Sequence, residues 1–274
     1  MVRTDFRNTP SPDLGRLHLQ RLAWLEEAEG TVIALPGDYP DGYRVPEHCH
    51  SRAQLLHART GVVKINTGQG RWMVPPEHAM WIPAGVEHSV EMLGLVRMLS
   101  VYVRPDAITG LPQGLQVFGL TSLATNLIIE AADLPHDASA GSRAALVKAL
   151  LLHEIANLPL RPLGLPFPSD PRLAELCRRF VEKPSPHATI DDWAAQTGMS
   201  RRTFTRTFLR ETGLSLSTWR QQACLFAALP RLAGGEPITG VALDLGYDSV
   251  PAFTTMFRRM LGKAPREYFR AAKL

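Results

Sequence analysis

Residues 190–208 read IDDWAAQTGMSRRTFTRTF, and residues 238–257 read ITGVALDLGYDSVPAFTTMF. Each stretch has an apolar helix, a turn at Gly198 or Gly246, a serine that can cap the next helix, and aromatic residues four apart. This order is the pattern of a helix-turn-helix unit, whose second helix enters the major groove of DNA. One such unit is a weak signal, because any helical hairpin with a glycine turn looks the same. Two units in register predict a DNA-binding domain.

In the first unit Ser200 can cap the second helix, and Phe204 and Phe208 are expected to face inward. The remaining side chains then lie on the outer surface, where arginine can pair with guanine and threonine can contact a base through its hydroxyl or methyl group. The residues expected to contact DNA here are Arg201, Arg202, Thr203, Thr205 and Arg206.

In the second unit Ser249 can cap the second helix, and Phe253 and Phe257 are expected to face inward. The outward residues are short and mostly uncharged, so this unit is expected mainly to position the domain, while the cations after them contact phosphates. The residues expected to contact DNA here are Val250, Thr254, Thr255, Arg258, Arg259 and Lys263, and Pro251 also faces outward.

Positive charge is concentrated in the part of the chain that holds both units. From residue 166 onward there are 16 Lys and Arg against 10 Asp and Glu, whereas the preceding residues have 14 against 16. A partner rich in phosphate requires such an excess of cations. The 274 residues, 45% of them hydrophobic, are otherwise typical of a globular chain long enough for two domains.

The first part of the chain has the pattern of short strands separated by turns, which is typical of an all-β barrel or sandwich. Two helices are expected to follow, near 120–132 and 142–157. The expected strands are 54–58, 61–66, 70–74, 78–83 and 95–103. The second helix carries more apolar residues at helical spacing than a lone surface helix would, so the pair is expected to dimerise the protein. The residues expected to be buried are Ala145, Leu146, Ala149, Leu150, Leu152 and Ile155.

Five prolines between residues 159 and 171 indicate a linker, because prolines this dense cannot lie inside a helix or a central strand. They are Pro159, Pro162, Pro166, Pro168 and Pro171. From Asp170 onward the chain is predicted to be helical, with a long helix near 216–233 that joins the two units. The predicted domains are a barrel at 1–110, a helical dimerisation segment at 111–158, the linker at 159–169 and the DNA-binding domain at 170–274.

Three histidines are predicted to meet in the barrel. His48 and His50 are one residue apart, so on a strand they project to the same face, and His88 comes from a hairpin across the barrel. Converging imidazoles could hold Zn²⁺, Ni²⁺, Fe²⁺ or Cu²⁺, with Gln54 as a further candidate ligand. Alternatively, the histidines hydrogen-bond a small organic ligand or one another. Cys49 is expected to face away from them.

The residues from near Leu173 to Phe269 resemble the AraC/XylS family of bacterial transcription regulators. The resemblance implies two recognition helices in successive major grooves, joined by a rigid helix. It rests on Gly246-Tyr247, Phe253, Phe257-Arg258, Gly262, Pro265, Tyr268 and Arg270. The base-reading positions that it implies are Arg202, Thr205, Arg206, Val250, Thr254 and Thr255. Pro251 and Ala264 depart from the usual residues of the family.

The histidine motif resembles the cupin pattern H-x-H-x₃-E-x₆-G followed by P-x-G-x₂-H, except that Gln54 replaces the glutamate and Met92 the final asparagine. Enzymatic cupins usually need that carboxylate, so the resemblance implies a sensor that is not an enzyme. Two alternatives stay open. One is a metal-dependent cupin enzyme fused to a DNA-binding domain, and the other is a barrel that only dimerises the protein.

These observations predict an α+β multidomain protein: a cupin barrel with two following helices, then an all-α domain of two helix-turn-helix units joined by a linker helix. It is expected to be a cytoplasmic transcription regulator, because no apolar run approaches the ~20 residues that span a membrane, and three scattered cysteines fit a reducing compartment. The expected partners are double-stranded promoter DNA, a small-molecule or metal effector, a second copy in a homodimer, and RNA polymerase if the protein activates transcription.

Overall fold

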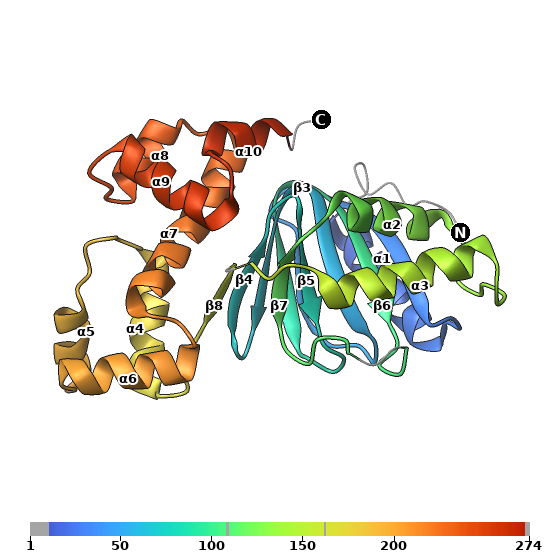
Figure 1. Ribbon diagram of the computed structural model, residues 1–274, viewed down its shortest axis with the longest axis horizontal. Coiled ribbons are helices and arrows are strands. Elements are labelled where there is room, and N and C mark those ends of the chain that lie inside the picture. The colour runs from blue at the N-terminus through green and yellow to red at the C-terminus, as the bar shows by residue number, and fades with distance from the viewer. Residues whose placement is uncertain (1–10, 108–109, 162, 272–274) are drawn as a thin grey trace. The chain divides into compact units, whose positions relative to one another are not determined.

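The structure, a computed structural model, describes residues 11–107, 110–161 and 163–271, and the chain divides into two compact units (Figure 1). The first unit consists of Met1–Thr67 and Val74–Arg161, and the second of Gly68–Met73 and Pro162–Leu274. Within the described residues, the first unit is an antiparallel sheet with helices and the second is mainly helical, so the predicted fold class is confirmed. Pro162 and the first ten residues of the predicted barrel lie outside the described residues.

The sheet of the first unit is built around its longest strand. All pairs are antiparallel: β3 lies along one edge of β6, β2 and then β1 lie along the other edge, and β5 joins β3 to β7. The strands are β1 (Val32–Tyr39), β2 (Arg44–His48), β3 (Ala53–Thr67), β5 (His78–Ile82), β6 (His88–Val103) and β7 (Gln116–Gly119). The predicted strands omitted β1, β2 and β7.

The predicted turn between strands 54–58 and 61–66 is wrong, because β3 runs through both. The register against β6 shifts on either side of Thr60, which is the mark of a β-bulge. Gly61 has φ +69°, and a Cβ there would lie 2.8 Å from the carbonyl oxygen of Leu95. The glycine therefore permits a bulge within one strand instead of ending a strand.

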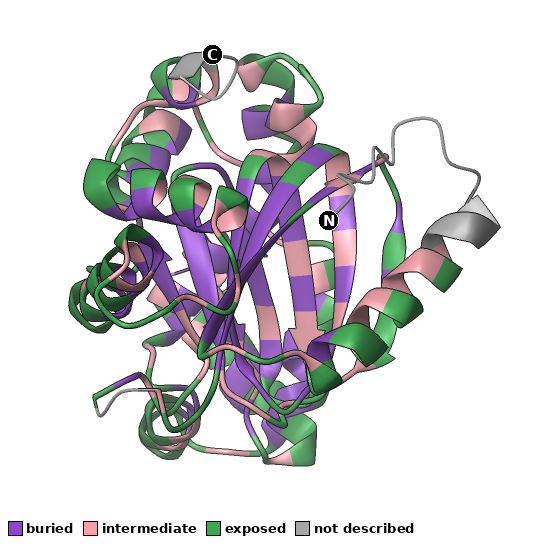
Figure 2. Ribbon diagram, turned by 90° about the vertical axis from the view of Figure 1, so that its right-hand side faces the viewer, coloured by how far each residue is buried: buried purple, intermediate pink, exposed green. Residues whose placement is uncertain are grey.

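Two helices follow the strands, as predicted, and they cover one face of the sheet. They are α2 (Ser122–Asp133) and α3 (Arg143–Asn157), capped by Thr121 and Ser142. Apolar residues from β1, β3, β5 and β6 meet the inner sides of these helices in one core, and Figure 2 shows the buried residues following the strands.

The burial predicted for the second of these helices is partly wrong. Leu152 and Ile155 of α3 are buried, but Leu146 is 64% exposed and Leu150 is 43% exposed. Ala149 is also exposed and Ala145 is half-buried. The helix turns Leu151 toward the sheet instead, and Ala144 is also buried. One part of its apolar stripe packs on the sheet, and another part faces outward.

A helix that the sequence did not predict lies on the opposite face of the sheet. This helix, α1 (Ser11–Glu27), packs Leu25 against Ile33, Leu35 and Tyr102. Residues 33 and 35 alternate with the strand residues that face α2 and α3, so the sheet lies between α1 and that helical pair.

The second unit holds the predicted helices. Asp170 caps the first of them with proline at the first position, as expected, and the long helix predicted near 216–233 is confirmed as α7. The helices are α4 (Pro171–Glu182), α5 (Ile190–Thr197), α6 (Arg201–Thr212), α7 (Leu216–Ala233), α8 (Ile238–Asp244), α9 (Val250–Leu261) and α10 (Pro265–Ala271).

The second unit also contains a pair of short strands. The proline-rich stretch predicted as a linker includes β8 (Gly164–Pro166), which pairs with β4 (Gly70–Val74). The carbonyl of Pro166 then accepts a hydrogen bond of 2.9 Å from the indole of Trp219 on α7. A short strand with one bonded edge tolerates proline, which explains how it fits here. None of the described helices combines the length and the hydropathy that a membrane-spanning helix requires.

Candidate functional site

The first helix-turn-helix unit is formed by α5 and α6, and local hydrogen bonds define its ends. Thr189 and Asp192 form a capping box at the start of α5, and Gly198, with φ +69°, ends that helix in the left-handed region. The hydroxyl of Ser200 accepts from the backbone N–H of Thr203, which caps α6 as predicted. These bonds fix a short turn between the two helices.

An aromatic cluster sets the orientation of α6. Trp193 lies at its centre, with ring centroids 6.2 Å from Phe204, 6.1 Å from Phe208 and 6.0 Å from Trp219. Both phenylalanines are almost fully buried, so their predicted inward orientation is confirmed. Because α6 packs through this side, its opposite side faces outward.

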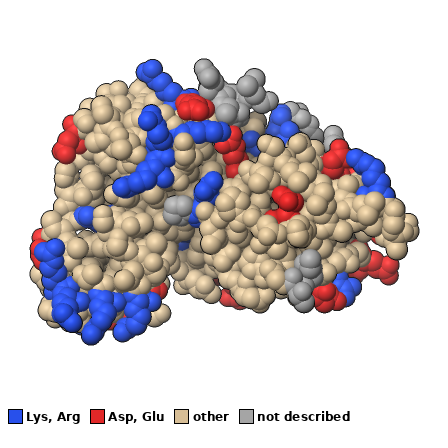
Figure 3. Space-filling view, viewed as in Figure 1, with Lys and Arg blue, Asp and Glu red and all other residues tan. Residues whose placement is uncertain are grey.

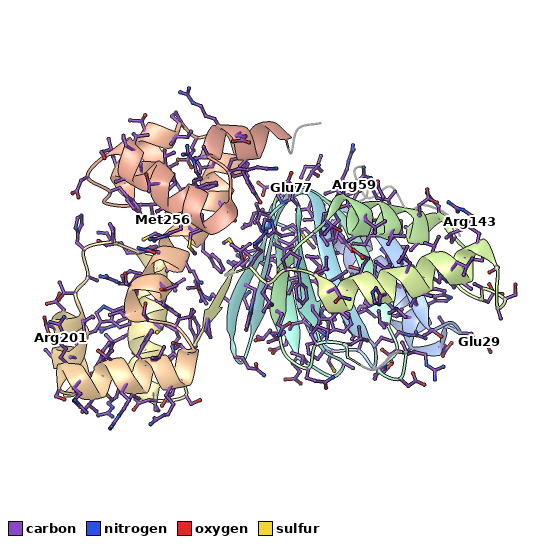
Figure 4. All side chains as sticks on the ribbon, in the orientation of Figure 1. Glu29, Arg59, Glu77, Arg143, Arg201 and Met256 are labelled. Atoms are coloured by element: carbon purple, nitrogen blue, oxygen red, sulfur yellow. The ribbon has the colours of Figure 1, made fainter. Side chains whose placement is uncertain are left out.

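The outward side of α6 is strongly cationic, and Figure 3 shows Lys and Arg side chains gathered over this helix. The five side chains predicted here, Arg201, Arg202, Thr203, Thr205 and Arg206, are all exposed. Arg201, labelled in Figure 4, is tied to Asp191 of α5 at 3.0 Å. In the part of the chain that the structure describes, Arg202 and Arg206 have no hydrogen-bond or ion-pair partner. These two guanidinium groups are available to an external acceptor.

The second unit, α8 and α9, repeats this construction. Ser249 caps α9, and the buried rings of Phe253 and Phe257 pack against Tyr247 and Tyr268. Pro251 lies in the first turn of α9, where proline is tolerated.

The outward residues predicted on this unit are less uniformly accessible than those on α6. Thr255, Arg258 and Arg259 are exposed, whereas Val250, Thr254 and Lys263 are half-buried. Arg259 hydrogen-bonds Gln221 of α7. Within the described residues, the unpartnered arginines at predicted base-reading positions, Arg202 and Arg206, therefore both lie on the first unit.

The three histidines predicted to meet do so in the first unit. His48 ends β2 and His88 begins β6, directly opposite in register, and their ring centroids are 4.3 Å apart. The ring of His50 is 5.3 Å from that of His88. Ring nitrogens of all three lie within 4.8 Å of one another. Cys49, between the first two, is exposed, as expected.

Each of these rings is held by a backbone carbonyl two residues away. Nδ1 of His48 donates to Pro46, Nδ1 of His88 donates to Val86, and Nδ1 of His50 donates to Arg52. Because a carbonyl only accepts, each Nδ1 carries the hydrogen, and each Nε2 of a neutral ring keeps a free lone pair. Metal-binding histidines are oriented in the same way, by a hydrogen bond from the second ring nitrogen.

Gln54 completes one side of the cluster. Its Oε1 lies 3.2 Å from Nε2 of His50, and its amide nitrogen donates to the hydroxyls of Ser100 and Tyr102. With Nδ1 of His50 protonated, the oxygen and the ring nitrogen are both acceptors, so a cation between them would stabilise the pair. If the amide oxygen and nitrogen exchange places, the amide donates to His50 instead and no cation is needed. A protein that binds a metal ion here has the first orientation of the amide, and a protein that binds none has the second.

Burial favours the uncharged forms of His48 and His88. It lowers the pKa of His88 to about 4, with a further lowering from the neighbouring imidazoles, and it also lowers the pKa of His48. Nε2 of His88 is buried without a hydrogen-bond partner among the described residues. Such a group costs about 1–3 kcal/mol unless a ligand satisfies it. Neutral imidazoles with free lone pairs are the form that binds metal ions.

Sequence reasoning missed a fourth histidine at this cluster. His18 of α1 lies edge-on to His48, with ring centroids 5.6 Å apart. Burial lowers its pKa to about 4, and both of its ring nitrogens are buried without a hydrogen-bond partner in the described residues. No spacing rule links a helix at residue 18 to a strand motif at residue 48. By contrast, His57 and His78 are buried elsewhere, and both are bonded to carbonyls.

Two family models match the chain: residues 31–156 match an AraC-like ligand binding domain, and residues 193–271 match a helix-turn-helix domain. The HTH-type transcriptional regulator NimR of Escherichia coli strain K12 is 34% identical over 223 residues, which cover 81% of each chain. The regulatory protein SoxS of the same strain is 35% identical over 80 residues, 29% of this chain and 75% of SoxS. A structure of ToxT from Vibrio cholerae aligns with 88% of this chain and 98% of its own, with 9% identity and a TM-score of 0.37.

Proposed function

Because the chain belongs to the AraC family of transcriptional regulators, with a ligand-binding domain and a helix-turn-helix DNA-binding domain, we propose that a divalent transition-metal ion controls its DNA binding. The ion is held by His48, His50 and His88. One observation carries the proposal: all three rings bond backbone carbonyls through Nδ1, which leaves the Nε2 lone pairs as the donors to an ion, that of His50 beside Oε1 of Gln54, and a ring nitrogen of each histidine lies within 4.8 Å of the others.

The ligand set favours Zn²⁺, Ni²⁺, Cu²⁺ or Fe²⁺ over harder ions, because imidazole suits these metals. Gln54 adds a neutral oxygen where a carboxylate would lower the charge of the site. The ion therefore keeps its full double charge when bound. We assign the cluster to sensing because residues 31–156 match the ligand-binding domain of a regulator family.

The proposed base-reading residues lie mainly on α6. Arg202 and Arg206 are exposed and unpartnered in the described structure, and Thr205 lies between them. Arginine pairs with guanine through two hydrogen bonds, so this helix supplies most of the sequence discrimination. The residues of α9 that face outward, Val250, Thr254 and Thr255, make short apolar or hydroxyl contacts. The proposed phosphate contacts are Arg201, Thr203, Arg258, Arg259 and Lys263.

We also propose that the protein is a homodimer through the outward side of α3. Leu146 and Leu150 are one helical turn apart on that side and are 64% and 43% exposed. Leu123 of α2 is 47% exposed. Burying such a stripe removes apolar surface from water, at about 25 cal/mol per Å². A dimer would place two DNA-binding domains on neighbouring sites.

The function is tested by measuring metal content and DNA affinity on the same protein. Full-length protein, purified without a metal-chelating resin, is analysed for bound metals and titrated with an operator selected from random DNA, before and after chelation. His88→Ala should lose the metal and the metal-dependent change in affinity, whereas His153→Ala, at an exposed position of α3, should retain both. Metal-free wild-type protein that cannot be loaded, or an affinity that metal does not change, would disprove the proposal.

A further inference from the structure

The face of the sheet that carries the histidine cluster is the face that α1 covers. Leu25 of α1 packs on Tyr102, whose ring also lies 5.3 Å from the ring of His50. The hydroxyl of Tyr102 accepts from Gln54 at 3.3 Å. One strand residue thus contacts α1, His50 and Gln54 together.

The end of α1 is fixed to the segment that carries His50. The guanidinium of Arg52 donates to the carbonyls of Leu25, Ala28 and Gly30, at and just beyond the end of the helix. Glu26 accepts from the backbone N–H of Ser51 at 3.0 Å. Because the carbonyl of Arg52 itself accepts from His50, a continuous chain of hydrogen bonds joins the helix end to a ring of the cluster.

His18 lies two turns before Leu25, and residues seven apart share one side of a helix. Packing of Leu25 on the sheet therefore turns His18 toward the same surface, where its ring meets that of His48. Arg21, between them, donates to the carbonyl of Pro36 at 2.6 Å, which fixes the helix midway. The ring of His18 has no hydrogen-bond partner in the described residues, although it is largely buried.

We propose that His18 is a fourth ligand, which closes the site as a tetrahedral four-imidazole centre and ties α1 to the sheet. This inference rests on the proposed metal site. Three imidazoles leave one position of a tetrahedral ion open, and a closed set of four protein ligands is typical of sites that hold an ion without catalysis. His18 lies just outside the three rings, so binding draws the helix inward. Binding of the ion thereby changes the position of α1.

The test compares four full-length proteins: wild type, His18→Gln, His88→Ala and the control Gln20→Ala, which changes an exposed residue of the same helix. Each is titrated with Co²⁺, whose absorption spectrum reports the number and geometry of its ligands, and with Zn²⁺ in competition with a chelator. For His18→Gln we expect at least about a tenfold weaker affinity, since losing even an indirect partner of a metal site costs that much, and a changed Co²⁺ spectrum. Gln20→Ala should match the wild type.

Hydrogen exchange of the wild type, with and without Zn²⁺, needs no variant and therefore does not depend on any variant folding. Amides of α1 should exchange more slowly when Zn²⁺ is bound. If the wild type binds metal through His88, but His18→Gln has the same affinity and spectrum and α1 exchanges equally in both states, the fourth ligand is wrong and the proposed metal site stands. If the wild type binds neither ion, or binds them equally well without His88, the proposed metal site fails and this inference fails with it.

Discussion

Oε1 of Gln54 lies 3.2 Å from Nε2 of His50, and both side chains are almost fully buried. Gln54→Glu would place a carboxylate at this point, and a negative charge beside the ion should strengthen Zn²⁺ binding by about tenfold, or ~1.4 kcal/mol. Competition with a chromophoric chelator measures the change. The exposed Gln113→Glu is the matched control. Equal affinities of Gln54→Glu and wild type would place the ion away from this residue.

Arg206 of α6 is predicted to read a base. Arg206→Ala should weaken binding to the selected operator by about 1–3 kcal/mol and relax the preference at one base pair, because a bidentate contact with guanine is lost. Arg210→Ala is the control on the same helix, since Arg210 is paired with Glu211. Binding to operator and random DNA, measured in parallel, decides the point. Equal losses on both would show that Arg206 contacts phosphate only.

Arg258, exposed near the end of α9, is predicted to contact a phosphate. Arg258→Gln should lower the affinity for DNA of every sequence. It should also make the slope of log affinity against log salt shallower by about one, because each phosphate contact releases roughly 0.9 of a counterion. Lys263→Ala is expected to act in the same direction. Arg178→Gln, an exposed position of α4, serves as the control. An unchanged slope of log affinity against log salt would exclude the contact.

Leu150→Glu should separate the proposed dimer into monomers, because it places a charge in the exposed apolar stripe of α3. Light scattering on a sizing column gives the mass of each variant. Leu95→Glu changes a leucine on β6 with similar exposure, 50%, and should leave the mass unchanged. A wild type that is already monomeric, or a dimer that survives Leu150→Glu, would exclude this interface.

Titration of the buried His57 should make the free energy of unfolding depend on pH. Burial lowers its pKa to about 4, whereas an unfolded histidine titrates near 6.5. Between these values only the unfolded chain binds the proton, so the free energy of unfolding falls as the pH drops from 6.5 to 4, by about 3 kcal/mol for this group. His57→Gln should flatten that part of the curve of unfolding free energy against pH. An equally steep fall in the variant would assign the effect to other groups.

The sequence was most informative where structure depends on neighbours along the chain. The caps at Ser200 and Ser249 and the inward rings of Phe204 and Phe208 follow from local rules, and the structure confirms them. The meeting of His48, His50 and His88 was expected from their spacing and is confirmed, although β2 ends at His48, so His50 lies just beyond the strand that was predicted to hold both.

Features that depend on how elements dock were not predictable from the sequence. The periodicity of α3 marked an apolar stripe, but it could not show that Leu146 and Leu150 turn away from the sheet. A turn was wrongly predicted at Gly61, because a glycine that ends a strand and a glycine that permits a bulge look alike in sequence. His18 reaches His48 only because Leu25 anchors α1 on the sheet.

The pairing of β4 with β8 means that no single cut in the chain separates the two units. Gly70, Arg71 and Trp72 pair with residues 164–166, and these residues in turn hold the indole of Trp219 on α7. A chimaera that joins another regulator's sensor at the proline-rich stretch would leave β8 without its native partner strand. A functional chimaera therefore has to take two segments from this protein: residues 68–73, and the segment from residue 162 onward that holds the DNA-binding helices.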